Sequence, residues 1–234
     1  AAVFAVLLAG CSSGFADTKP PDPPPSKRFE HDMMVRFHMH QNFDLLRAIE
    51  RLLIKGKLEE ARTFAAAIAS APDEPSHGPW ASYQVTIRDR AAAVARATDV
   101  TDALRKTAMI GATCGNCHDD QVVKLALDTV PQLPPDAPSL DARMARHRWA
   151  ADRLWEGVVG NSEQAWRAGL DVLASKPFEE PASRAGIARQ LQRQADVARR
   201  PPPGKLIDRA TSYGEILATC ASCPWSAAAP RSTR

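Results

Sequence analysis

The chain has 234 residues, of which 44% are hydrophobic, so it is long enough to bury one or two cores of ordinary size. Its formal net charge of +3 at pH 7 is too small to indicate a nucleic-acid partner. Aromatic residues make up only 6%, and Ala, Leu, Arg and Glu dominate the periodic segments, which favours helices over strands. We therefore expect an all-α protein.

Residues 1–11 have the pattern of an export signal. The first ten are apolar throughout, too few to span a bilayer and about the length of the apolar core of a signal peptide. They end in Leu8-Ala9-Gly10-Cys11, which resembles the lipobox of bacterial lipoproteins. That resemblance implies cleavage before Cys11, a diacylated sulfur and a periplasmic, membrane-anchored protein. A buried helical turn ending in a core cysteine is the alternative. No Met or basic segment precedes the apolar run, so we expect the natural start to lie further upstream.

Residues 12–28 are a predicted tether between the lipid and the folded part. The tract Asp17 to Lys27 contains five prolines, which exclude a helix and favour the extended polyproline II conformation. At about 3.1 Å per residue the spacer reaches roughly 30 Å.

The strongest motif is Cys114-Gly115-Asn116-Cys117-His118. A CxxCH sequence is the attachment signature of a c-type haem, in which two thiols bond to the porphyrin vinyl groups and the adjoining imidazole binds the iron. A zinc knuckle would need two more ligands nearby, and a thioredoxin-type redox pair would need a βαβ surround. We therefore expect haem c as the cofactor, attached at Cys114 and Cys117, with His118 as axial iron ligand.

The part of the chain after the tether contains an internal duplication. Four patterns recur about 105 residues apart, which indicates two copies of one unit. They are Met39-x-x-Asn42 with Met144-x-x-His147, Glu59-x-Ala61 with Glu163-x-Ala165, Ala69-Ser70-x-Pro72 with Ala174-Ser175-x-Pro177, and Cys114-x-x-Cys117 with Cys220-x-x-Cys223. We expect one domain at 29–130, a Pro-rich linker at 131–138, a second domain at 139–224 and an irregular tail at 225–234.

Each copy is predicted to contain four helices, separated by proline, glycine and short polar turns. The short connections favour an antiparallel four-helix bundle in each copy. The expected helices lie at 30–54, 58–70, 80–98 and from 101 to the first Cys pair, and then at 140–159, 162–175, 182–199 and 205–220.

A four-helix bundle with CxxCH at the end of its last helix resembles the class II c-type cytochromes, the cytochrome c′ group. The resemblance covers both copies, and Cys114, Cys117 and His118 match the motif residue by residue. The second copy departs from it, because Pro224 follows Cys223 and proline cannot bind iron. We expect one haem, with Cys220 and Cys223 as a vestigial second site or, if that site is functional, a second haem. A reading-frame change before the tail is the other explanation of Pro224.

The expected function is single-electron transfer with a redox partner that the sequence does not identify. The alternative is a five-coordinate haem module that binds or senses nitric oxide or carbon monoxide, as cytochrome c′ members do. No acid–base pair or nucleophile stands out near the motif, so an electron carrier is favoured over an enzyme. His31, His40, His77 and His147 have no partner at metal-ligand spacing and are expected to be surface or packed histidines.

The sixth iron ligand is expected from the first predicted helix. In an antiparallel bundle the fourth helix ends where the first begins, which places the haem beside residues 33–40. Met39 lies on the apolar stripe that repeats in the second copy, and His38 lies beside it. Met39 is therefore the first candidate and His38 the second.

Overall fold

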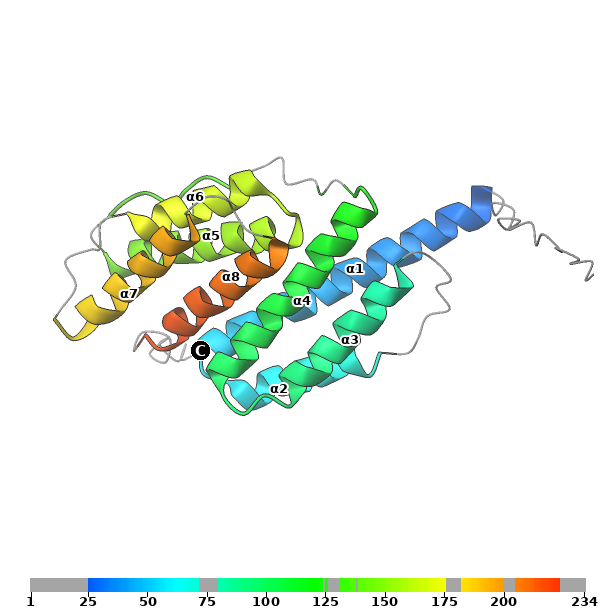
Figure 1. Cartoon of the computed structure of the whole chain (residues 1–234), viewed down its shortest axis with the longest axis horizontal. Helices are drawn as coiled ribbons and strands as arrows, with labels where there is room; N and C mark the ends of the chain where they lie inside the picture. The colour runs from blue at the N-terminus through cyan, green and yellow to red at the C-terminus, as the bar shows by residue number, and fades with distance from the viewer. Residues whose placement is uncertain are drawn as a thin grey trace, which may run out of the picture. The chain divides into compact units, whose positions relative to one another are not determined.

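The computed structural model describes residues 25–71, 80–123, 125, 131–137, 139–175, 182–199 and 205–223 (Figure 1). These residues contain eight α-helices and no strand, which confirms the all-α prediction for this part of the chain. None of the described helices combines the length and the apolarity that a membrane crossing needs. The predicted export signal with Cys11, the tether up to residue 24, Pro224 and the tail at 225–234 lie outside the described residues.

The helix positions agree closely with those expected from the sequence. The helix α5 has the predicted bounds, and α2, α6, α7 and α8 each begin and end within one residue of them. The helix α3 ends at Ala95, three residues before the predicted end, and α4 continues past the Cys pair to Asp120. The helices are α1 (Pro25–Ile54), α2 (Leu58–Ala69), α3 (Ala81–Ala95), α4 (Val100–Asp120), α5 (Leu140–Val159), α6 (Glu163–Ala174), α7 (Ala182–Ala198) and α8 (Leu206–Ala221).

The tether prediction is wrong at its C-terminal end. The helix α1 begins at Pro25, so Pro25 to Lys27 are helical rather than extended. Proline is tolerated in the first turn of a helix, because the amide hydrogen that it lacks would have no partner within the helix there. The last proline of the tract therefore starts the helix.

The chain divides into two compact units, Ala1–His40 and Gln41–Arg234. In the second unit, contacts between α5 and α6, α6 and α7, α7 and α8, and α8 and α5 close a ring of four helices. The helices α2, α3 and α4 contact one another in chain order. The helix α4 also lies alongside α8 and contacts α5, so the last helices of the two repeats pack together (Figure 1).

A single cluster of buried apolar side chains in the second unit contains members from all eight helices. Its largest members are Trp155 and Trp166, 1% and 2% exposed, and Tyr213, which is fully buried. The Trp155 ring lies 5.9 Å from that of Tyr213 and 6.4 Å from that of Phe43, measured between centroids. One hydrophobic core therefore draws on residues of both predicted repeats.

The predicted linker has no regular structure over residues 131–137. Its backbone is held against α5 by two side chains of that helix. The indole of Trp149 donates a 2.7 Å hydrogen bond to the carbonyl of Pro131, and Arg146 donates one of 2.8 Å to the carbonyl of Pro134. The linker therefore runs along α5, and the predicted domain boundaries on either side of it remain predictions.

Candidate haem site

The helix α4 carries Cys114, Cys117 and His118 in its last two turns. The helix starts at an N-cap, where the carboxylate of Asp99 accepts a 2.8 Å hydrogen bond from the backbone N–H of Asp102. A side-chain oxygen at this position satisfies an amide that has no partner within the helix. The motif is thus held on one continuous helix.

Both thiols of the motif are largely shielded from solvent. Cys117 is 6% exposed, and Cys114 is half-buried against the core. Both are free thiols. Burial, together with the neighbouring Cys117 sulfur, raises the pKa of Cys114 to about 12, and burial raises the pKa of Cys117. Both side chains are therefore neutral thiols at pH 7.

His118 is oriented by a backbone carbonyl from the second repeat. Its Nδ1 lies 2.7 Å from the oxygen of Val159, the last residue of α5. A carbonyl oxygen only accepts hydrogen bonds, so Nδ1 carries a hydrogen, and in the neutral imidazole Nε2 then keeps its lone pair. Histidines that bind metals in proteins are usually held in this way, with one nitrogen donating and the other free for the ion.

The approach of α5 to α4 depends on two glycines in α4. A Cβ atom at Gly115 would lie 2.3 Å from the carbonyl oxygen of Val158, and one at Gly111 would lie 2.7 Å from the Trp155 ring. Neither contact leaves room for a methyl group. Glycine at these positions lets the end of α5 reach His118.

The turn after α5 adds a further contact to the motif. The amide of Asn161 donates a 2.7 Å hydrogen bond to the carboxylate of Asp119, the residue after His118. Asn161 has a φ of 47°, in the left-handed region that asparagine enters more readily than most residues. Its amide oxygen accepts a 3.2 Å hydrogen bond from Arg209 of α8, so α4, α5 and α8 are joined around His118.

On the other side of α4, the first turn of α3 contacts the end of the motif. The hydroxyl of Tyr83 donates a hydrogen bond to the carboxylate of Asp120. That hydrogen bond raises the pKa of Tyr83 to about 12. Among the described residues no group of three or more His, Cys, Asp or Glu side chains is arranged to hold a metal ion directly. A haem group brings four iron ligands of its own, so one histidine is enough to hold it.

Met39 and His38, the candidate sixth ligands, lie on α1 in the unit that ends at His40. Their part in the site stays a prediction.

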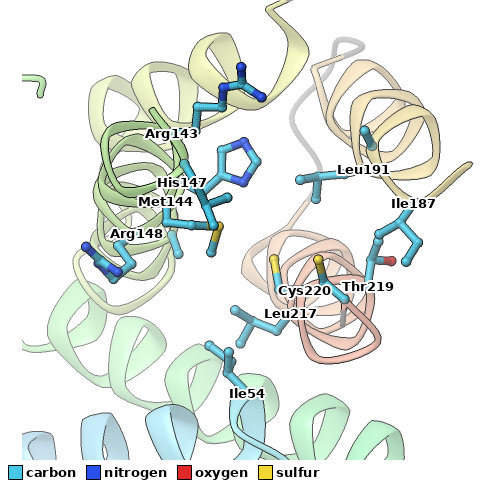
Figure 2. A pocket seen from close by; sticks show the side chains of 14 residues that line it. Ile54, Arg143, Met144, His147, Arg148, Ile187, Leu191, Leu217, Thr219 and Cys220 are labelled. Atoms are coloured by element: carbon cyan, nitrogen blue, oxygen red, sulfur yellow. The ribbon is translucent and has the colours of Figure 1, made fainter. Parts of the chain in front are cut away.

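A cavity lies beside the second Cys pair (Figure 2). It is partly open to solvent, and the centre of a water molecule can move through about 140 Å³ within it. Cys220, at the end of α8, and Cys223 both line it, together with Met144 and His147 of α5. Its other lining residues are Ile54, Leu140, Arg143, Arg148, Ala151, Ile187, Ala188, Leu191, Leu217 and Thr219.

The sequence alone predicted neither the contact of His118 with Val159 nor the place of His147. The spacing of Gly111 and Gly115 by four residues is the sequence signal for the first, since small residues on one helix face permit close packing. The match of Met144-x-x-His147 with Met39-x-x-Asn42 is the sequence signal for the position of His147.

No protein-family model, curated protein or solved structure matches this chain.

Proposed function

We propose that this protein is a c-type cytochrome that carries single electrons through a haem attached at Cys114 and Cys117. In this proposal the chain forms two tandem antiparallel four-helix bundles of the cytochrome c′ type, and a lipid on Cys11 anchors it to a bacterial membrane on the periplasmic side. The ring of contacts among α5, α6, α7 and α8 supports the bundle arrangement of the second repeat.

The geometry of His118 carries the proposal. Its Nδ1 donates to the Val159 carbonyl at 2.7 Å, which leaves Nε2 available to iron and fixes the plane of the ring. A dithiol redox site would not need this histidine oriented in this way. A zinc site would hold it in the same way but would need further side-chain ligands, and among the described residues no group of three or more His, Cys, Asp or Glu side chains is arranged to supply them. The same ring lies next to Cys117, as attachment of one macrocycle to all three side chains requires.

The haem iron would supply the one-electron couple, and the residues of this chain would set its reduction potential. A histidine that donates Nδ1–H to a carbonyl is a more basic ligand, which favours ferric over ferrous iron and lowers the reduction potential. The close contact of Gly115 with α5 keeps His118 at a fixed distance from that carbonyl. A site that is held rigidly changes little between oxidation states, as an electron carrier requires.

Expression in a bacterium with a periplasmic haem-attachment system tests the proposal. The protein should give a covalent haem by denaturing gel stain and pyridine haemochrome spectrum, and a reversible one-electron titration. His118→Ala should abolish the titration, whereas His40→Ala, a change on the exposed surface of α1, should leave it intact. A chain without covalent haem would refute the proposal. A haem that is high spin and binds carbon monoxide rapidly would favour gas binding over electron transfer.

A further inference from the structure

The cavity beside Cys220 and Cys223 corresponds to the predicted haem site of the first repeat. In the duplication Cys220 and Cys223 occupy the positions of Cys114 and Cys117, and Met144 occupies that of Met39. All three line the cavity of the second repeat. The structure therefore places an open space where a second macrocycle would lie.

The chemistry of the walls suits a flat apolar group with charged edges. Together with Ile54 of α1, leucine, isoleucine, alanine and methionine side chains from α5, α7 and α8 make up more than half of the lining. Arg143 and Arg148 of α5 supply positive charge at the same cavity, and guanidinium groups pair well with carboxylates such as haem propionates. Pockets for cofactors in helical proteins commonly have this composition, with a few polar groups in an apolar wall.

His147 lines the cavity from α5, and Cys220 lines it from α8. Figure 2 shows the side chains of His147 and Met144 extending from α5 into the space in front of α8, where Cys220 lies. His147 is half-buried, so its ring is shielded from bulk water without being sealed off. An imidazole at this place could bind an iron that the residue after Cys223, a proline, cannot bind.

We propose that this cavity binds a second haem, with His147 of α5 as the iron ligand in place of a histidine after Cys223. The inference rests on the cavity and its lining and not on the state of the Cys114 site. It gives the second repeat a cofactor whose ligand comes from the first helix of the repeat rather than from the last. Two haems in one chain would extend the proposed electron carrier to two redox centres.

Titration of the purified full chain with haemin tests this. The wild-type protein should bind one equivalent beyond any covalent haem, with a Soret band typical of imidazole ligation. His147→Ala should lose that band and bind haemin about tenfold more weakly or worse, in line with the loss of a metal-site residue. His40→Ala, a histidine outside the cavity, should behave as the wild type does.

A cavity-filling variant provides a second, independent readout. Ala188→Trp places an indole in the cavity from α7 and should abolish saturable haemin binding, while circular dichroism shows unchanged helicity. A wild-type chain without a saturable additional equivalent, or a His147→Ala variant with wild-type affinity and spectrum, would overturn the inference.

The two proposals fail separately. Cys114→Ser with Cys117→Ser removes the covalent haem of the first site and should leave the additional haemin equivalent in place. A wild-type chain with covalent haem but no additional equivalent would keep the proposed function and refute the second site. A chain that binds the additional equivalent of haemin but has no covalent haem would support the second site and refute the proposed function.

Discussion

Tyr213 of α8 donates a 2.7 Å hydrogen bond to the carboxylate of Glu50 in α1, and both side chains are buried. Arg47, one turn earlier on α1, donates a 2.7 Å hydrogen bond to the other oxygen of Glu50 and a second one to Asp152 of α5. Its guanidinium also lies 5.9 Å from the centroid of the Trp155 ring. A polar network therefore joins α1, α5 and α8, with Glu50 and Tyr213 buried in the core and Asp152 half-exposed at its end.

Removal of the Tyr213 hydroxyl should destabilise the whole second unit. Tyr213→Phe leaves one oxygen of a buried carboxylate without its donor, which typically costs about 1–3 kcal/mol. Urea unfolding followed by circular dichroism measures the change. Tyr83→Phe is the matched control, because its hydroxyl bonds an exposed carboxylate, and we expect a change within about 0.5 kcal/mol. Equal losses in the two variants would contradict the structural role of the buried pair.

Glu50 should make the protein less stable as the pH rises. Burial raises its pKa above the ordinary value of 4.5, and this effect outweighs the opposing charge of Arg47 and the hydrogen bond from Tyr213. The native state then holds the proton more tightly than the unfolded state, so the contribution of Glu50 is complete below pH 4.5 and is lost as the pH rises through the native pKa.

Glu50→Gln removes this titration. The unfolding free energies of wild type and variant are measured at intervals from pH 4 to pH 8. The wild type should lose stability relative to the variant as the pH rises. A difference that is constant over this range would show that the native pKa of Glu50 is not raised.

The helices were predictable from the sequence because their signals are local. The bounds of α5 follow from the N-cap Ser139, whose hydroxyl accepts from the N–H of Ala142, and from Gly160 after its last turn. The start of α1 at Pro25 was missed, because proline favours both the extended conformation and the first turn of a helix.

The candidate site was predictable only in part. The spacing of Cys114, Cys117 and His118 is a local pattern, and its interpretation as a haem motif needs no tertiary structure. The partner of His118 is the backbone oxygen of Val159, which lies 41 positions away and has no side-chain signature. The position of His147 on a cavity wall likewise depends on how α5, α7 and α8 pack.

A methyl group at Gly115 should separate α5 from α4. Gly115→Ala puts a Cβ 2.3 Å from the Val158 carbonyl oxygen, and overpacking of a core contact costs about 1–3 kcal/mol. Gly186→Ala, within α7, meets no atom within 4 Å and should stabilise the protein by roughly 0.5–1 kcal/mol through helix propensity. We expect urea unfolding to show a lower unfolding free energy for Gly115→Ala and a higher one for Gly186→Ala. Destabilisation by both changes would contradict the close approach of α4 and α5.

Loss of the proposed haem should cost more than redox activity. If the macrocycle fills core volume beside Cys114, a His118→Ala or Cys114→Ala variant that lacks it has a large cavity, with a loss of several kcal/mol. For a chain of this length that corresponds to a melting temperature lower by about 10 °C. A melting temperature within two degrees of the haem-loaded protein would argue against a haem in the core.

Lipid attachment is tested at Cys11, with the chain expressed behind a complete signal sequence. A thioether-linked diacylglycerol adds two acyl chains, enough for stable membrane anchoring. The wild-type protein should sediment with membranes and Cys11→Ser should be released into the periplasmic fraction. Cys223→Ser is the control for a general effect of losing a thiol. A wild-type protein found fully soluble in the periplasm, with an unmodified Cys11, would disprove the anchor.

The sixth iron ligand decides between an electron carrier and a gas-binding module. Met39 has the counterpart Met144 in the duplication, and Met144 lies on the wall of the cavity that contains Cys220. The sequence duplication therefore predicts Met39 as the ligand opposite His118, through its thioether sulfur. Methionine is a common axial ligand in cytochromes c and raises their reduction potential.

Met39→Leu keeps the size and apolar character of the side chain and removes the sulfur. The ferrous protein should then change from a low-spin to a high-spin spectrum and bind carbon monoxide rapidly, with a lower reduction potential. His38→Leu serves as the test of the second candidate and should leave the spectrum unchanged if Met39 is the ligand. A wild-type protein that is already high spin, with a spectrum unaffected by Met39→Leu, would show that the distal side is open, and gas binding would replace electron transfer as the leading function.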